Sequence, residues 1–172
     1  MTPADLARTF YAGIDPGREG GLVAIDNLSV PIFKSPLPFL GGLLDIRAFC
    51  EIVEHLFRET RGARAHFVME EASIRPGQRG AVAFVRSFAN MEGAVAALGY
   101  SVETVKSSVW TRAMFKGLPA SLQDKERSIY LASRLWPEFE LRFPGQRPTT
   151  KNANISDATL LAEWKRRQTL GV

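Results

Sequence analysis

The stretch Tyr11-Ala-Gly-Ile-Asp-Pro-Gly-Arg-Glu-Gly-Gly-Leu-Val-Ala-Ile-Asp26 constrains how the rest of this chain can be arranged. It predicts an apolar strand that ends at Asp15, a turn built on Pro16 and Gly17, and a second apolar strand from Leu22 to Ile25. Two strands joined by so short a glycine-containing link pair antiparallel. Asp15 therefore lies at a strand end, where α/β folds collect ligands. The alternative is a turn residue that only binds its own loop amides.

The composition is that of an ordinary globular protein with a small excess of positive charge. Of the 172 residues, 45% are hydrophobic and 23% are charged, and the formal net charge is +4. These values favour one domain, residues 1–172, with a full core and a loose leader at residues 1–9. The charge is compatible with a polyanionic partner but does not require one.

Few residues are available as soft metal ligands. Cys50 is the only cysteine and the two histidines, His55 and His66, are isolated, so any bound metal must be held by carboxylates. The lack of a disulfide framework favours a reducing compartment. No apolar run approaches the ~20 residues of a membrane span and no signal-peptide profile is present. We therefore expect no membrane partner and an intracellular, non-secreted protein.

The chain after the hairpin alternates between extended and helical patterns. The predicted elements are a strand at 28–33, a helix at 43–61, a strand at 65–71, a helix at 81–98, a strand at 101–105, a basic helical segment at 106–116, and helices at 122–136 and 154–167. This order predicts an α/β fold with a mixed five-stranded sheet, its first three strands antiparallel, and helices on both faces. With acidic residues on the first strand, the fourth strand and the last helix, the order is typical of the ribonuclease H-like fold.

Three of these acidic residues, Asp15, Glu70 and Asp157, are placed where elements begin or end. If the first and fourth strands are neighbours, Asp15 and Glu70 meet at one sheet edge, and the first turn of the last helix can bring Asp157 there. Three such carboxylates repel each other unless a cation neutralises them, so the pattern predicts Mg²⁺ or Mn²⁺ and phosphodiester hydrolysis.

Each carboxylate also has a simpler interpretation. Adjacent residues on a strand face opposite sides, so only one of Glu70 and Glu71 can point into the site, and the other is a surface charge. Asp157 could do no more than stabilise a helix dipole.

Three sequence blocks carry a resemblance to a known family. Gly13-Ile-Asp15-Pro-Gly17, Val68-Met-Glu70 and Ser156-Asp-Ala-Thr-Leu-Leu-Ala-Glu-Trp164 resemble the signature blocks of RuvC-like Holliday junction resolvases, most closely the phage and organellar branches. Val105-Lys-Ser-Ser-Val-Trp110 is similar to the Trp-containing basic segment of these proteins. The resemblance spans roughly residues 10–165.

The resemblance implies a metal-dependent nuclease of DNA recombination and repair, located in a bacterial or phage-infected cytoplasm or in an organellar matrix. Such an enzyme is a homodimer that resolves four-way DNA junctions by paired nicks on opposing strands. Asp15, Glu70 and Asp157 would be its catalytic residues and ligands of Mg²⁺ or Mn²⁺. The helix at 81–98 is the candidate dimer interface, with core packing against the sheet as the alternative. Ile74 or Phe84 could insert into the junction.

The last block departs from the family pattern. The family carries two acidic residues three apart at the start of this helix, whereas Asn154 stands three before Asp157. Asn154 can still bind a metal ion through its carbonyl oxygen but adds no charge. A weakly bound single ion, a different use of Lys151 or Glu163, and loss of cleavage all remain open.

The resemblance further implies phosphate contacts from cations around the cleft. The candidates are Arg75, Arg79, Lys106, Arg112, Lys116 and Arg147. Each of these side chains has a simpler interpretation as a solvated surface charge.

Three other functions compete with junction resolution. The Asp-x-Gly-x-x-Gly pattern from Asp15 also occurs in actin-like ATPases, but those proteins need two such domains around the nucleotide. Another ribonuclease H-like nuclease, acting on RNA–DNA hybrids or flaps, would use the same metals. A protein that binds junctions with weakened or no cleavage would be compatible with Asn154.

Overall fold

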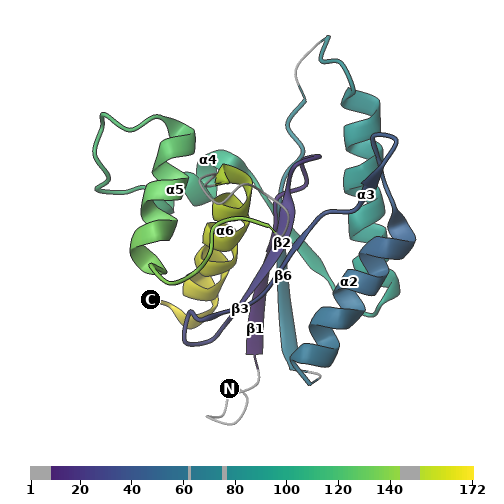
Figure 1. Cartoon of the computed structure of the whole chain (residues 1–172), viewed down its shortest axis with the longest axis horizontal. Helices are drawn as coiled ribbons and strands as arrows, with labels where there is room; N and C mark the ends of the chain where they lie inside the picture. The colour runs from purple at the N-terminus through teal and green to yellow at the C-terminus, as the bar shows by residue number, and fades with distance from the viewer. Residues whose placement is uncertain (1–8, 62, 75–76, 144–151) are drawn as a thin grey trace.

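The computed structural model describes residues 9–61, 63–74, 77–143 and 152–172. Their centre is a five-stranded sheet with the strand order β3-β2-β1-β6-β7 (Figure 1). The strands are β1 (Thr9–Ile14), β2 (Gly21–Asp26), β3 (Pro31–Pro36), β6 (Arg64–Glu70) and β7 (Val102–Val105). β1, β2 and β3 pair antiparallel, whereas β6 is parallel to both β1 and β7. The predicted ribonuclease H-like sheet is thus confirmed.

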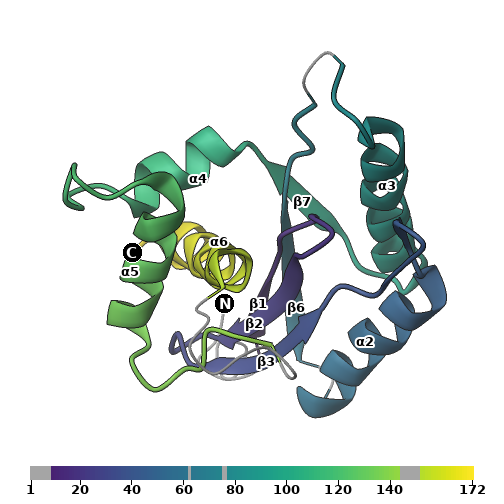
Figure 2. The same ribbon diagram turned by 45° about the horizontal axis from the view of Figure 1, so that its top comes forward.

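Helices cover both faces of the sheet. They are α2 (Ile46–Glu59), α3 (Ala81–Ala97), α4 (Ser107–Met114), α5 (Asp124–Leu135) and α6 (Ala153–Leu170). Figures 1 and 2 show α2 and α3 on one side of the sheet, and α4, α5 and α6 on the other. Within the described residues, no helix is both long and apolar enough to cross a membrane.

The third strand lies later in the chain than predicted. Residues 27–30 form a turn, in which the Asp26 carboxylate accepts hydrogen bonds from the backbone N–H groups of Leu28 and Val30, at 2.9 and 2.8 Å. Ser29 adopts a left-handed conformation, with φ at 66°. The apolar residues Leu28 and Val30 therefore precede the strand instead of opening it.

The first long helix also begins later than predicted. Asp45 caps α2, because its side chain accepts a hydrogen bond from the backbone N–H of Ala48 at 3.0 Å. The two residues before the cap, Leu43–Leu44, form β5, which pairs with β4 (Phe39–Leu40) in a small separate hairpin. Leu43 and Leu44, which were predicted to begin the helix, are therefore extended.

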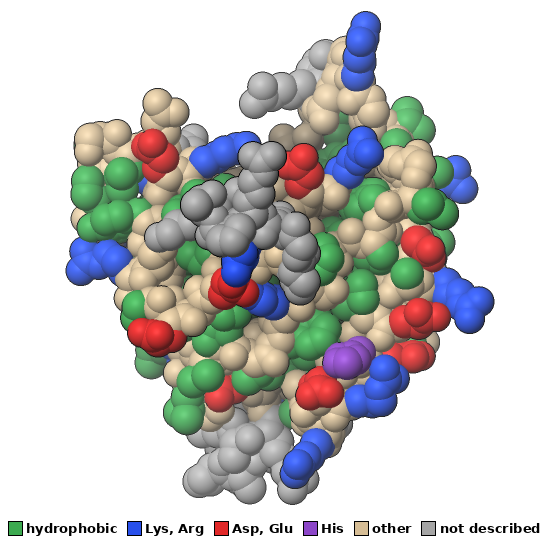
Figure 3. Space-filling model, viewed as in Figure 1, with side chains coloured by type: hydrophobic (Ala, Val, Ile, Leu, Met, Phe, Trp, Pro, Cys, Tyr) green, Lys and Arg blue, Asp and Glu red, His purple; other side chains and the backbone are tan. Residues whose placement is uncertain are grey.

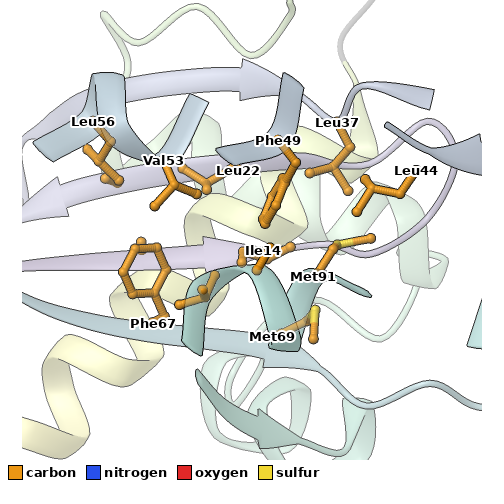
Figure 4. Packing of buried hydrophobic residues seen from close by; sticks show 14 of the residues in the cluster. Ile14, Leu22, Leu37, Leu44, Phe49, Val53, Leu56, Phe67, Met69 and Met91 are labelled. Atoms are coloured by element: carbon orange, nitrogen blue, oxygen red, sulfur yellow. The ribbon is translucent and has the colours of Figure 1, made fainter. Parts of the chain in front are cut away.

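Alternation along the strands produces two cores, one on each face of the sheet. On β1, Phe10, Ala12 and Ile14 face α2 and α3, and are fully or almost fully buried. Figure 4 shows the α2 side chains Phe49 and Val53 directed at this face. On the opposite face, Val23 of β2 and Val68 of β6 belong to a second cluster, in which α6 lies on the strands and α4 and α5 pack against α6. That second face also carries the candidate site.

The contact between α6 and β1 leaves no space for a side chain. A Cβ atom on Gly13 would lie 2.0 Å from the Ala158 carbonyl oxygen and 2.7 Å from the Ala162 backbone nitrogen. Both obstructing atoms belong to backbone and cannot rotate away. Gly13 therefore allows the helix to rest on the strand itself.

Replacing Gly13 by alanine should push α6 off the sheet. Overpacking of this kind costs about 2–3 kcal/mol, which corresponds to a melting temperature lower by roughly 5–10 °C in a protein of this size. Thermal unfolding followed by circular dichroism measures the effect. Gly17→Ala is the matched control, because a Cβ there would have its nearest neighbour, the Asp15 Oδ1 atom, at 3.5 Å. Equal melting temperatures for the two variants would contradict this packing.

Candidate active site

Asp15 and Glu70 reach the same face of the same sheet edge. Asp15 follows β1 and continues the alternation of Tyr11 and Gly13, which face α6. The parallel register pairs Ile14 with Met69, so Asp15 and Glu70 come next at the same level. The Asp15 carboxylate accepts a hydrogen bond from the backbone N–H of Gly17 at 3.2 Å, which holds it within its own turn. Asp15 is therefore both a turn residue and a member of the candidate site.

Of the two consecutive glutamates, the structure directs Glu70 into this site. Its Oε2 atom accepts a hydrogen bond of 2.8 Å from the indole Nε1–H of Trp110, and the hydroxyl of Ser107 also bonds to the carboxylate. Glu71 is exposed, and its backbone N–H donates to the carbonyl of Val105 at 2.8 Å. Glu70 thus faces α4, whereas Glu71 lies at the surface.

Asp157 lies on α6, but not in the first turn of this helix as predicted. Asn152 caps the helix, whose first turn contains no acidic residue, so Asp157 lies in the second turn. The neighbouring Ala158 rests on Gly13, which places Asp157 next to the end of β1. Its carboxylate accepts a hydrogen bond from the Ser128 hydroxyl on α5.

All three carboxylates have a raised pKa, and burial is the largest cause for each. The pKa of Asp157 is raised to about 7, mainly by burial and to a lesser degree by the charges of Asp15 and Glu70, while the hydrogen bond from Ser128 lowers it. The pKa of Asp15 is raised to about 6, mainly by burial and to a lesser degree by the Glu70 charge, while the hydrogen bond from the Gly17 N–H lowers it. Burial is also the main cause of the raised pKa of Glu70. The Lys125 cation lowers the pKa of both aspartates without offsetting these effects.

The donor set fits a hard divalent cation. Carboxylate oxygens are the ligands that Mg²⁺ and Mn²⁺ take, and uncompensated, partly buried negative charge favours binding of a cation. As the described residues stand, however, no group of three or more His, Cys, Asp or Glu side chains is gathered closely enough to hold one metal ion. The carboxylates therefore interact through their charges, without forming a completed coordination shell.

Asn154 and Glu163 both have partners that limit their use as ligands. The Asn154 side-chain amide donates to the carbonyl oxygen of Glu19, at 3.1 Å, and so ties the start of α6 to the β1–β2 turn. Glu163 is 2% exposed and bonds to Arg166, Arg167 and Ser29. Burial acts to raise its pKa, but the hydrogen bonds from these partners lower it overall. Glu163 therefore belongs to a separate ion cluster toward the other end of α6.

Predicted DNA-contacting cations lie in two cavities beside α4. One, of about 540 Å³, contains Arg112 and Lys116. The other, of about 460 Å³, is lined by Lys106, Ile74 and Glu71. Arg79 is exposed on the segment before α3, and Figure 3 shows basic side chains on the part that projects beyond the sheet. Arg75, Arg147 and Lys151 lie outside the described residues.

Four residues beside the carboxylates were not predicted from the sequence, namely Ser107, Trp110, Lys125 and Ser128. Trp110 stood out only as part of a basic segment, and Ser128 and Lys125 only as parts of a charged helix. Lys125 and Ser128 are three apart on α5 and so share one face of it. The hydrogen-bonding capacity of a buried indole was the available signal for Trp110, because such a group needs an acceptor.

Comparison with solved structures identifies the same fold in RuvC of Thermus thermophilus. The structure of "T. thermophilus RuvC in complex with Holliday junction substrate" matches with a TM-score of 0.67 and 15% sequence identity, covering 95% of this chain and 96% of that one. A second structure of Thermus thermophilus RuvC gives a TM-score of 0.62 at 15% identity, covering 94% and 96%. No family model and no curated protein matches the sequence. The predicted RuvC-like resemblance is confirmed at the level of the fold.

Removing one carboxylate should stabilise the metal-free protein. An acid with a raised pKa in the folded state destabilises that state increasingly as the pH rises from its unfolded value near 4 to the folded value of about 7. Asp157→Asn should therefore raise the melting temperature at pH 8 in EDTA by roughly 3–6 °C, for about 1–2 kcal/mol. The gain should shrink as the pH is lowered toward 4.

The opposite charge change supplies the control. Asn154→Asp adds a fourth negative charge and loses the donor to Glu19, so it should lower the melting temperature under the same conditions. A gain for Asp157→Asn that did not vary with pH would show that charge repulsion is not its cause.

Proposed function

We propose that this protein is a structure-selective DNA endonuclease that resolves four-way junctions. It would act as a Mg²⁺- or Mn²⁺-dependent hydrolase that makes paired nicks on opposing strands. The observation that carries the proposal is the placement of Asp15 and Glu70 at one sheet edge with Asp157 of α6 beside them, close enough for their charges to raise the pKa of both aspartates. The RuvC fold over 95% of the chain supports the same assignment.

The residues around the proposed site suit attack of water on a phosphodiester. A divalent cation bound by the carboxylates would activate the water and stabilise the leaving 3′ oxygen. Asp15 and Asp157 would supply negative charge from two different elements. Lys125 adds a cation beside them and can compensate charge on a bound phosphate. The turn after Asp15 carries Gly17, which lets a DNA strand approach its backbone closely.

The proposed DNA contacts continue on either side of α4. Arg112 and Lys116 in one cavity and Lys106 in the other would bind phosphates and fix the direction in which the strand crosses the site. Ile74 is 44% exposed in the second cavity and is placed to contact bases at the junction. Phe84 is half-buried near the start of α3 and is less accessible.

Paired nicking requires two active sites, and α3 is the proposed homodimer interface. The two faces of this helix differ. Met91, Ala94 and Val95 are buried against the rest of the protein. The opposite face exposes mostly small or apolar residues, namely Val82, Val85, Ala89, Gly93 and Ala96. Core packing and dimer formation would therefore use opposite sides of α3.

The central test is cleavage of a synthetic four-way DNA junction by wild-type protein and by Asp15→Asn. Wild type should nick opposing strands of the junction in Mg²⁺ or Mn²⁺. The variant should lose detectable cleavage while binding the junction equally well, because the cation site loses one charged ligand and the fold does not change. Gel assays of cleavage and band-shift assays of binding measure the two effects. Normal cleavage by Asp15→Asn would make Asp15 a turn residue only.

The same assay distinguishes the related functions through its other substrates. Linear duplex and RNA–DNA hybrid should remain uncut under conditions that resolve the junction. Preferred cutting of hybrids or flaps would point to another ribonuclease H-like nuclease. Tight junction binding by wild type with no nick would favour a binding protein, which is the alternative that Asn154 supports by lacking the second charge. Asn154→Asp would then show whether that charge is what is missing.

A charged substitution on the exposed face of α3 should separate the two subunits. Ala89→Glu places two like charges in the proposed interface, so the mass in solution should fall from twice 19.0 kDa to 19.0 kDa. Paired nicks should become uncoupled single nicks. Sedimentation equilibrium and junction cleavage measure these changes. Gln168→Glu, at an exposed position of α6, is the control and should change neither. An unchanged dimer in Ala89→Glu would place the interface elsewhere.

A further inference from the structure

The indole N–H of Trp110 donates to Glu70, and the ring that carries it is held in the protein core. Trp110 is 2% exposed and lies among Val68, Met114 and Leu161 in the core between the sheet and α4, α5 and α6. Its ring meets that of Phe115 edge-on, with centroids 5.7 Å apart. An indole packed in this way cannot turn its N–H elsewhere, so the direction of the 2.8 Å bond to Glu70 is fixed by the core.

The chemistry of this bond suits a residue that orients a ligand without replacing the cation. An indole donates one hydrogen bond and carries no charge, so it leaves the negative charge of Glu70 intact. A carboxylate offers about four lone-pair positions on its two oxygens. After bonds from Trp110 and Ser107, positions remain for a cation. A lysine or arginine at this place would instead neutralise the carboxylate and compete with metal.

From these contacts we infer that Trp110 is a positioning residue, which holds Glu70 in the orientation that binds the divalent cation. The inference rests on the proposed function, because it takes Glu70 as a metal ligand. Trp110 acts through Glu70 and does not touch DNA or metal itself. Partners of this kind typically change metal affinity or activity 10- to 100-fold when removed.

The test measures Mn²⁺ binding in the full chain without DNA, by the electron paramagnetic resonance signal of free Mn²⁺. Trp110→Phe keeps an aromatic ring in the core but removes the donor, and should weaken Mn²⁺ binding about 10- to 100-fold. Trp136→Phe is the matched control. Trp136 is also a buried indole, but its N–H donates to the Ser29 carbonyl, on the β2–β3 turn. This control should lose a comparable amount of stability and retain wild-type Mn²⁺ affinity.

Glu70→Gln and the double variant Trp110→Phe/Glu70→Gln complete the cycle. If Trp110 acts only through Glu70, the double variant should bind Mn²⁺ as weakly as Glu70→Gln alone. Weakened binding in Glu70→Gln together with wild-type binding in Trp110→Phe would overturn the positioning role and leave the proposed function standing. Unchanged binding in Glu70→Gln would remove Glu70 from the metal site, and the proposed site would fail with it.

A second substitution keeps the inference testable if Trp110→Phe does not fold. Incorporation of 3-benzothienylalanine at position 110 replaces the N–H by sulfur and preserves the shape of the ring system. The same 10- to 100-fold loss of Mn²⁺ affinity is expected. Wild-type affinity in this variant would show that ring packing, and not the hydrogen bond, is what the site requires.

Discussion

The direct contact of α6 with β1 is the constraint on which the candidate site depends. Gly13 lets the α6 backbone at Ala158 contact the strand directly. Asp157 immediately precedes Ala158 in α6. The depth of this contact therefore determines how near Asp157 comes to Asp15. A side chain at position 13 would separate the helix from the sheet and move Asp157 away from Asp15. Close packing at Gly13 therefore sets the distance between these two carboxylates.

The same closeness makes the site a source of instability in the absence of a cation. Partly buried carboxylates repel each other, and among the described residues the Lys125 cation and a few hydrogen bonds compensate this repulsion in part. The rest of the protein tolerates this cost because two well-filled cores enclose the sheet. Here affinity for a cation and instability without one arise from the same charges.

Much of this arrangement could be predicted from local pattern, and the remainder depends on partners distant in sequence. The hairpin around Asp15 and the acid at the end of β6 could be predicted, because strand alternation and turn chemistry are local properties. The late start of β3 could not, since the Asp26 side chain competes with strand pairing for the amides of Leu28 and Val30. Trp110 meets Glu70 across forty positions, and no spacing rule anticipates such a contact.

The first turn and the C-terminal half of α6 are bonded to the two turns that flank β2. Asn154 bonds to Glu19 in the turn before β2, whereas Glu163 and Arg166 bond to Ser29 and Asn27 in the turn after it. Surface turns normally accept changes of length easily. Here the length of β2 fixes the distance between the two attachment points of α6. One residue gained or lost in either turn would therefore shift or tilt α6 and move Asp157 away from the sheet edge. Natural variation in this protein should therefore preserve the lengths of these two turns, even where their residues differ.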